Sequence, residues 1–132
     1  MKDVKAIADA LREGQIEQAL AIRSSLRDAN DDIQYEIMEV VRQSIISYLK
    51  GGEIERAKQA ERLFGLEKES VEDTVKQAVL SSFRDGDLET VIELKEGLPI
   101  PSALARDILD YCSSWGEPKY VERAVRVFGK TN

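Results

Sequence analysis

The sequence predicts an all-α fold, an αα-hairpin repeat array of the α-solenoid type with about eight helices in four pairs. A four-residue phrase, in which a branched apolar residue is followed by Glu, recurs at near-regular spacing along the 132 residues. Its glutamates are Glu17, Glu55, Glu89 and Glu122. In the first three copies a glycine lies two residues before the branched residue, at Gly14, Gly52 and Gly86.

Each repeat is expected to consist of a helix A, a glycine turn and a helix B. Apolar residues three and four positions apart, as at Ile37, Val41 and Ile45, mark the buried face of a helix. No stretch alternates with the period of two that strands require. We expect one domain over 1–132, with repeats at roughly 1–29, 30–66, 67–99 and 100–132. A compact bundle of the same helices is the alternative to a superhelix.

The helix boundaries are predicted from turn and capping chemistry. The turn glycines are expected to adopt the left-handed conformation that ends helix A, and the repeated Glu is expected in the first turn of helix B. Asp31 with Gln34, and Ser70 with Asp73, resemble capping boxes. Pro118 is typical of a first helical turn.

Composition excludes several classes of function. The chain has 25 acidic and 19 basic residues, a net charge of −6 and no histidine, which opposes nucleic-acid binding and removes the commonest catalytic base. Cys112 is the only cysteine, so neither an internal disulfide nor a thiolate zinc site is expected, and it is interpreted as a small core residue. With no phosphate-binding loop and no catalytic motif, we expect no enzymatic activity, no cofactor and no metal.

The expected location is the cytoplasm. The first residues lack the apolar stretch of a secretory signal, and no window approaches the length of an uncharged membrane-spanning segment.

The turn and the start of helix B resemble the tetratricopeptide repeat, in which an acid, a bulky residue and later a small residue follow the turn glycine. The matching stretches are Gly14-Gln15-Ile16-Glu17-Gln18-Ala19, Gly52-Glu53-Ile54-Glu55-Arg56-Ala57 and Gly86-Asp87-Leu88-Glu89. Helix A departs from that pattern, because Ile7, Ile45 and Val79 replace the family's small residue and are expected to separate the paired helices further. The resemblance implies a protein- or peptide-binding array whose inner face is lined by the A helices.

Aligning the repeats by their turn glycines identifies a candidate partner-binding row on helix A. The fourth copy of the phrase has its glycine, Gly116, five residues before the branched residue. Ten positions before Gly52, Gly86 and Gly116 lie Arg42, Lys76 and Arg106, and the next positions hold Gln43, Gln77 and Asp107. We expect the cations to anchor an acidic peptide or a C-terminal carboxylate, and the glutamines to contact its backbone. The competing interpretation is a solvated face on which Arg42 pairs with Glu39 and Lys76 pairs with Asp73.

The favoured function is a non-catalytic adaptor that binds a protein or peptide. The alternative is a homo-oligomer assembled through the terminal helices, in which Trp115 and Phe128 are candidate interface residues; Trp115 also suits a cap on the end of the core. A small-ligand sensor or an enzyme is a third, weaker alternative.

Overall fold

The computed structural model describes residues 2–129. In that range it contains eight α-helices and no β-strand, which confirms the all-α prediction. The helices are α1 (Lys2–Arg12), α2 (Ile16–Ser25), α3 (Asp31–Lys50), α4 (Ile54–Phe64), α5 (Lys68–Asp85), α6 (Leu88–Gly97), α7 (Ser102–Ser114) and α8 (Pro118–Phe128). None of these helices is long and apolar enough to cross a membrane.

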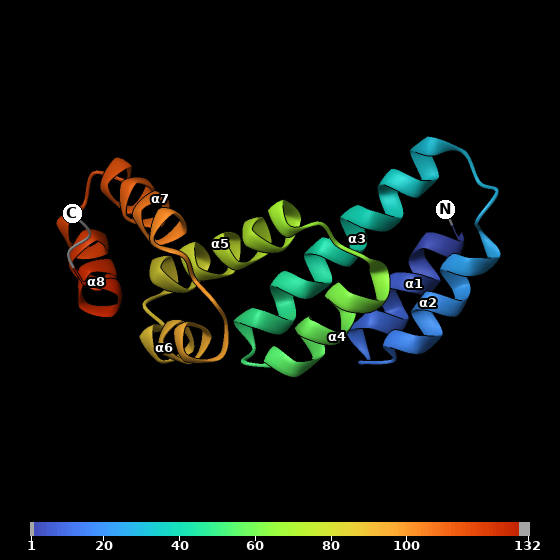
Figure 1. Ribbon diagram of the computed structural model, residues 1–132, viewed down its shortest axis with the longest axis horizontal. Coiled ribbons are helices and arrows are strands. Elements are labelled where there is room, and N and C mark those ends of the chain that lie inside the picture. The colour runs from blue at the N-terminus through green and yellow to red at the C-terminus, as the bar shows by residue number, and fades with distance from the viewer. Residues whose placement is uncertain (1, 130–132) are drawn as a thin grey trace.

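Each helix packs against its successor within the pairs α1–α2, α3–α4, α5–α6 and α7–α8. The odd-numbered helices also contact one another in chain order, from α1 through α3 and α5 to α7. Contacts between even-numbered helices join α2 to α4 and α6 to α8. The chain therefore advances along the long axis of an extended molecule, with α1 and α2 at one end and α7 and α8 at the other (Figure 1).

The core is a single cluster of buried apolar side chains that runs from Val4 in α1 to Val127 in α8. Ile37, Val41 and Ile45, which the helical periodicity places on one face of α3, are all fully buried. Cys112 is also fully buried, as predicted for a small core residue. Because apolar surroundings disfavour the thiolate, burial raises the pKa of the Cys112 thiol to about 11.

The turn glycines behave as predicted. Gly14, Gly52, Gly86 and Gly116 have φ values between 76° and 79°, in the left-handed region that side chains disfavour. The repeated glutamate lies in the first helical turn of α2, α4 and α6. That prediction is wrong for Glu122, because α8 already begins at Pro118 and the glutamate falls one turn later.

Both predicted capping boxes are wrong. The cap of α3 is Asn30, whose Oδ1 accepts a hydrogen bond from the backbone N–H of Ile33 at 3.0 Å. Gln34 instead donates from its side-chain amide to the carbonyl oxygen of Leu26, 2.7 Å away. In α5 the helix begins at Lys68, so Ser70 lies inside the first turn and no side chain caps the helix.

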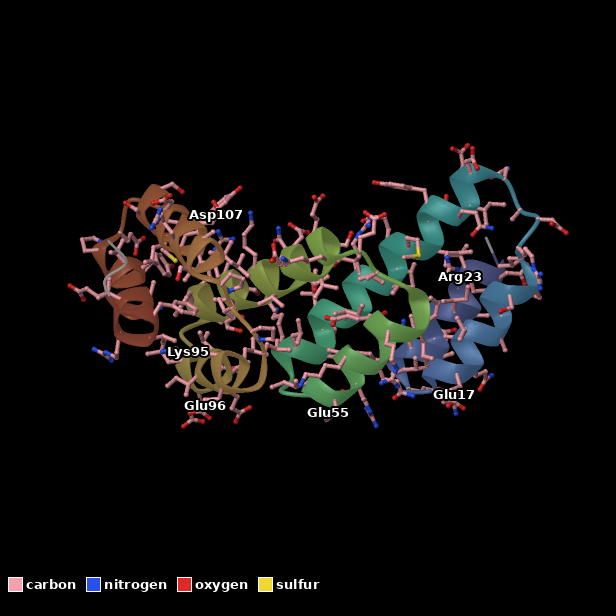
Figure 2. All side chains as sticks on the ribbon, in the orientation of Figure 1. Glu17, Arg23, Glu55, Lys95, Glu96 and Asp107 are labelled. Carbon is pink, nitrogen blue, oxygen red and sulfur yellow. The ribbon has the colours of Figure 1, made fainter. Side chains whose placement is uncertain are left out.

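Two cationic side chains, Arg23 and Lys95, connect neighbouring even-numbered helices (Figure 2). Arg23 of α2 donates to the carbonyl oxygen of Phe64 at the end of α4 (3.3 Å), and Lys95 of α6 donates to that of Val127 in α8 (2.7 Å). Both cations neutralise part of the negative end of the helix that they reach. Glu61 holds the same place in α4, counted from the first residue of the helix, and its Oε1 is buried without a hydrogen-bond partner among the described residues.

Candidate functional site

Three hollows lie between successive odd-numbered helices. The first, between α1 and α3, has a volume of about 540 Å³; the second, between α3 and α5, about 490 Å³; and the third, between α5 and α7, about 370 Å³. The first and second share Glu39 and Gln43, and the second and third share Gln77 and Ser81. They therefore adjoin, and we call the three together the odd-helix groove.

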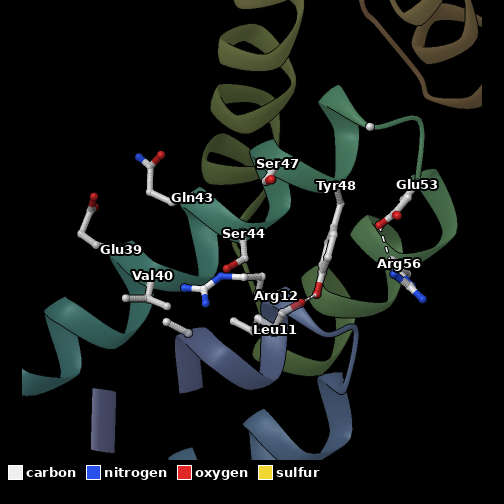
Figure 3. Close-up of a pocket in the computed structure, with 12 residues that line it drawn as sticks. Leu11, Arg12, Glu39, Val40, Gln43, Ser44, Ser47, Tyr48, Glu53 and Arg56 are labelled. Carbon is white, nitrogen blue, oxygen red and sulfur yellow. Dashed lines mark hydrogen bonds and ion pairs between the residues drawn. The ribbon is translucent and has the colours of Figure 1, made fainter. Parts of the chain in front are cut away.

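The first hollow combines an apolar floor with polar walls (Figure 3). Leu11 and Val40 line its base, and Ser44 and Ser47 face it from α3. Tyr48 closes it, and its hydroxyl donates a hydrogen bond to the carbonyl oxygen of Leu11 at the end of α1. Burial raises the pKa of the Tyr48 hydroxyl, so this group stays a neutral donor at ordinary pH.

The groove carries the opposite charge to the chain as a whole. Its lining contains five basic and three acidic side chains, a net charge of +2, whereas the chain carries −6. The basic residues are Arg12, Arg42, Lys50, Arg56 and Arg84, and the acidic ones are Glu39, Glu53 and Asp73. Serine hydroxyls and glutamine amides supply further donors and acceptors. Such a surface is suited to holding an anionic ligand by charge and hydrogen bonding.

Three of the five predicted partner-binding residues line the groove. Gln43 separates the first hollow from the second, Gln77 separates the second from the third, and Arg42 lies in the second. Arg42 forms an ion pair with Glu39 on the same helix, as the competing interpretation predicts. The two amides thus lie at the boundaries between hollows, while the Arg42 guanidinium is held in the ion pair with Glu39.

Lys76 lies beside the groove without lining it. Its Nζ is 3.1 Å from Oδ2 of Asp107 on α7 and 4.6 Å from the centre of the Tyr111 ring. The hydrogen bond to Asp107 raises the pKa of Lys76. The predicted partner Asp73 is on the same helix, but the neighbouring α7 presents a carboxylate that Lys76 reaches across the α5–α7 contact. With its side chain only 17% exposed, Lys76 is better described as a link between two helices.

Arg106 faces a separate hollow of about 360 Å³ toward the start of α7, together with Glu72, Asp107 and Asp110. This hollow is predominantly acidic. Arg42, Lys76 and Arg106 therefore occupy equivalent sequence positions without sharing one groove.

A different row of cations lines all three hollows. Arg12, Lys50 and Arg84 each lie two residues before a turn glycine, and each lines one hollow. Their common spacing is visible in the sequence. In the sequence alone this spacing does not indicate a binding site, because a basic residue in the last turn of a helix is ordinarily explained by the helix dipole. Only the packing of the next odd-numbered helix shows that this position borders a hollow.

The two aromatic candidates are both engaged in contacts within the chain. Trp115 packs edge-on against Tyr120, with ring centres 4.9 Å apart, and the Arg84 guanidinium lies 4.4 Å from the centre of the Trp115 ring. Trp115 also lines the third hollow. Phe128 is partly buried and packs edge-on against Phe83, at 6.0 Å between ring centres.

Comparison of the chain with protein-family models, with curated proteins and with solved structures gives no match. Within the described residues, no cluster of three or more His, Cys, Asp or Glu side chains is arranged to hold a metal ion.

Proposed function

We propose that this protein is a non-catalytic helical-repeat adaptor that binds an acidic segment of another polypeptide along the odd-helix groove. The observation that carries the proposal is the net charge of +2 on the groove lining of a chain with net charge −6. Random placement of the charges on so acidic a chain favours a negative lining. Segregated positive charge in a hollow attracts anionic segments and repels cationic ones.

The hydrogen-bonding groups of the groove favour a polypeptide as the ligand. Gln43 and Gln77 lie at the two boundaries between hollows, and each amide offers both a donor and an acceptor. Peptide groups offer the same pair in return. Ser47 and Ser81, at equivalent places in α3 and α5, add hydroxyls beside them.

The proposal includes a repeat architecture of four αα-hairpins, similar to tetratricopeptide repeats in the turn and the start of helix B. Three observations support it: the nearly identical φ values of the four turn glycines, the sequential contacts of the odd-numbered helices, and the regular lining of the hollows by Arg12, Lys50 and Arg84.

A displayed library of random peptides tests the function without knowledge of the partner. Selection on the wild-type protein should enrich sequences rich in Asp and Glu. A variant with Arg12, Lys50 and Arg84 all changed to Gln should lose that enrichment, because the groove lining then has two basic and three acidic side chains, a net charge of −1.

A matched control removes the same charge elsewhere. Arg27, Arg62 and Arg126 are exposed and line none of the three hollows, so changing all three to Gln should leave the selected peptides unchanged. Enrichment of neutral or basic peptides by the wild type, or equal loss in both variants, would contradict the proposal. Circular dichroism on each variant confirms that the fold is retained.

A further inference from the structure

We infer that the partner segment binds as a polyproline II helix with an acidic side chain at every third residue. The inference rests on the proposed function and specifies the conformation and register of the bound chain. It starts from the row of Arg12, Lys50 and Arg84, which gives each hollow one cation from an equivalent helical position.

None of these three cations pairs with a carboxylate that lines the groove, although the Arg84 guanidinium also lies over the Trp115 ring. Lys50 and Arg84 form no ion pair with any carboxylate of the described residues. Arg12 pairs with Asp9 at 3.2 Å, but its side chain is 75% exposed, and such pairs contribute little.

The acidic side chains of the groove are largely occupied by other cations. Glu39 is paired with Arg42, and Glu53 is paired with Arg56 at 3.2 Å. An incoming carboxylate therefore meets Arg12, Lys50 and Arg84 without displacing a groove carboxylate from them.

The spacing of the row sets the spacing of its ligands. Successive odd-numbered helices are in contact, and packed helices lie about 8–10 Å apart, so equivalent positions recur at about that distance. A polyproline II chain has three residues per turn and rises about 3.1 Å per residue, so every third side chain points the same way about 9 Å further on. In a β-strand, side chains on one face recur at about 7 or 13 Å, which fits the row less well.

An α-helix repeats one face after seven residues, or about 10.5 Å, so spacing alone does not exclude it. The groove's neutral polar groups decide against it. An α-helix satisfies its own backbone groups, whereas a polyproline II chain leaves every N–H and C=O free for partners. Gln43, Gln77, Ser47 and Ser81 would face an α-helix with little to bind on its backbone.

Three fluorescent peptides of equal length and equal net charge test the inference by fluorescence anisotropy. The first contains four repeats of Glu-Pro-Ala. The second has the same composition, with the four Glu residues grouped at one end. The third is an Ala- and Gln-rich helix former with four Glu residues on one face at intervals of seven, and neutral Gly-Ser flanks bring the first two peptides to its length. We expect the first peptide to bind about tenfold more tightly than either of the others.

Single substitutions locate the contacts. Lys50→Gln and Arg84→Gln should each weaken binding of the Glu-Pro-Ala peptide severalfold and largely abolish its advantage over the grouped peptide. The Arg27, Arg62 and Arg126 control variant should keep that advantage.

The outcomes separate the two proposals. Equal affinity for the repeated and grouped peptides overturns the polyproline register and leaves acidic-peptide binding standing. Tightest binding of the helical peptide overturns the polyproline II conformation and likewise leaves acidic-peptide binding standing. Absence of binding by all three peptides, together with a library selection that enriches no acidic sequence, overturns both proposals.

Discussion

Arg123 of α8 donates a hydrogen bond from its Nη1 to the carbonyl oxygen of Phe83, 2.9 Å away near the end of α5. The same guanidinium passes 3.6 Å from where a side chain on Gly86 would begin. Arg56 holds the equivalent position in the second copy of the recurring phrase, and its guanidinium lies over Gly14. In these two copies of the recurring phrase the arginine thus covers the turn that ends the odd-numbered helix of the preceding pair, α1 for Arg56 and α5 for Arg123. Repetition in the sequence alone does not reveal this role.

Replacing Arg123 by Ala should lower the free energy of unfolding by about 1–2 kcal/mol. The change leaves the part-buried Phe83 carbonyl without its charged donor and removes a cation from the negative end of α5. Arg126→Ala is the matched control, since this arginine is exposed on the same helix, and it should change stability by less than about 0.5 kcal/mol. Urea denaturation measures both, and equal effects would refute the role assigned to Arg123.

Two adjacent glycines provide a test of backbone strain. Gly52 has φ of 76° and Gly51 has φ of −88°. Gly52→Ala should destabilise the protein by about 1–2 kcal/mol, because a side chain disfavours the left-handed conformation. Gly51→Ala should leave stability unchanged or raise it by up to about 1 kcal/mol, since its Cβ meets only ordinary contacts. Thermal unfolding compares the two variants. A higher melting temperature for Gly52→Ala than for Gly51→Ala would contradict the left-handed conformation assigned to Gly52.

Glu61→Gln should stabilise the protein at neutral pH. Burial raises the pKa of the Glu61 carboxyl above its ordinary value, and Lys58 offsets this only in part. The folded state then holds the proton more tightly than the unfolded state. The destabilisation caused by ionised Glu61 is therefore absent below the pKa that this carboxyl has in the unfolded state. It grows as the pH rises toward the pKa of the folded state and is complete above that pKa.

Urea titrations of wild type and Glu61→Gln between pH 4 and 8 should accordingly show a gain in stability that is largest at the neutral end. Glu61 and Glu72 both line an apolar cavity together with Val71 and Val75. Glu72→Gln is the control, because among the described residues only Glu61 has a buried side-chain oxygen without a hydrogen-bond partner. A gain that does not vary with pH would contradict the assignment to Glu61 ionisation.

Phe128→Ala separates a core role from an interface role. The Phe128 ring packs against Phe83 at the end of the molecule, so its loss should cost about 2–4 kcal/mol of stability. Sedimentation should give the same oligomeric state for the variant as for the wild type. A dimer that dissociates on this substitution, with little change in protomer stability, would instead support assembly through the terminal helices.

Much of the local structure was predictable because it depends on neighbours in the chain. Apolar residues at helical spacing identified the buried face of α3, and glycines before the recurring phrase identified turns that require positive φ. The boundaries of α3 and α5 were predicted less well, since several polar residues near each start compete as caps. The Asn30 side chain caps the first turn of α3, and no side chain caps the first turn of α5.

The candidate site depended on contacts between helices that are distant in sequence. Equivalent spacing placed Arg42, Lys76 and Arg106 in one row, yet Asp107 on the next odd-numbered helix holds Lys76, and Arg106 faces a different hollow. The groove is instead bordered by the last-turn cations Arg12, Lys50 and Arg84. The sequence by itself determined the helices, their turns and the buried face, because periodicity and backbone conformation are local. Tertiary packing decided which charges are paired and which remain available, because that depends on the surface each helix leaves open to its neighbour.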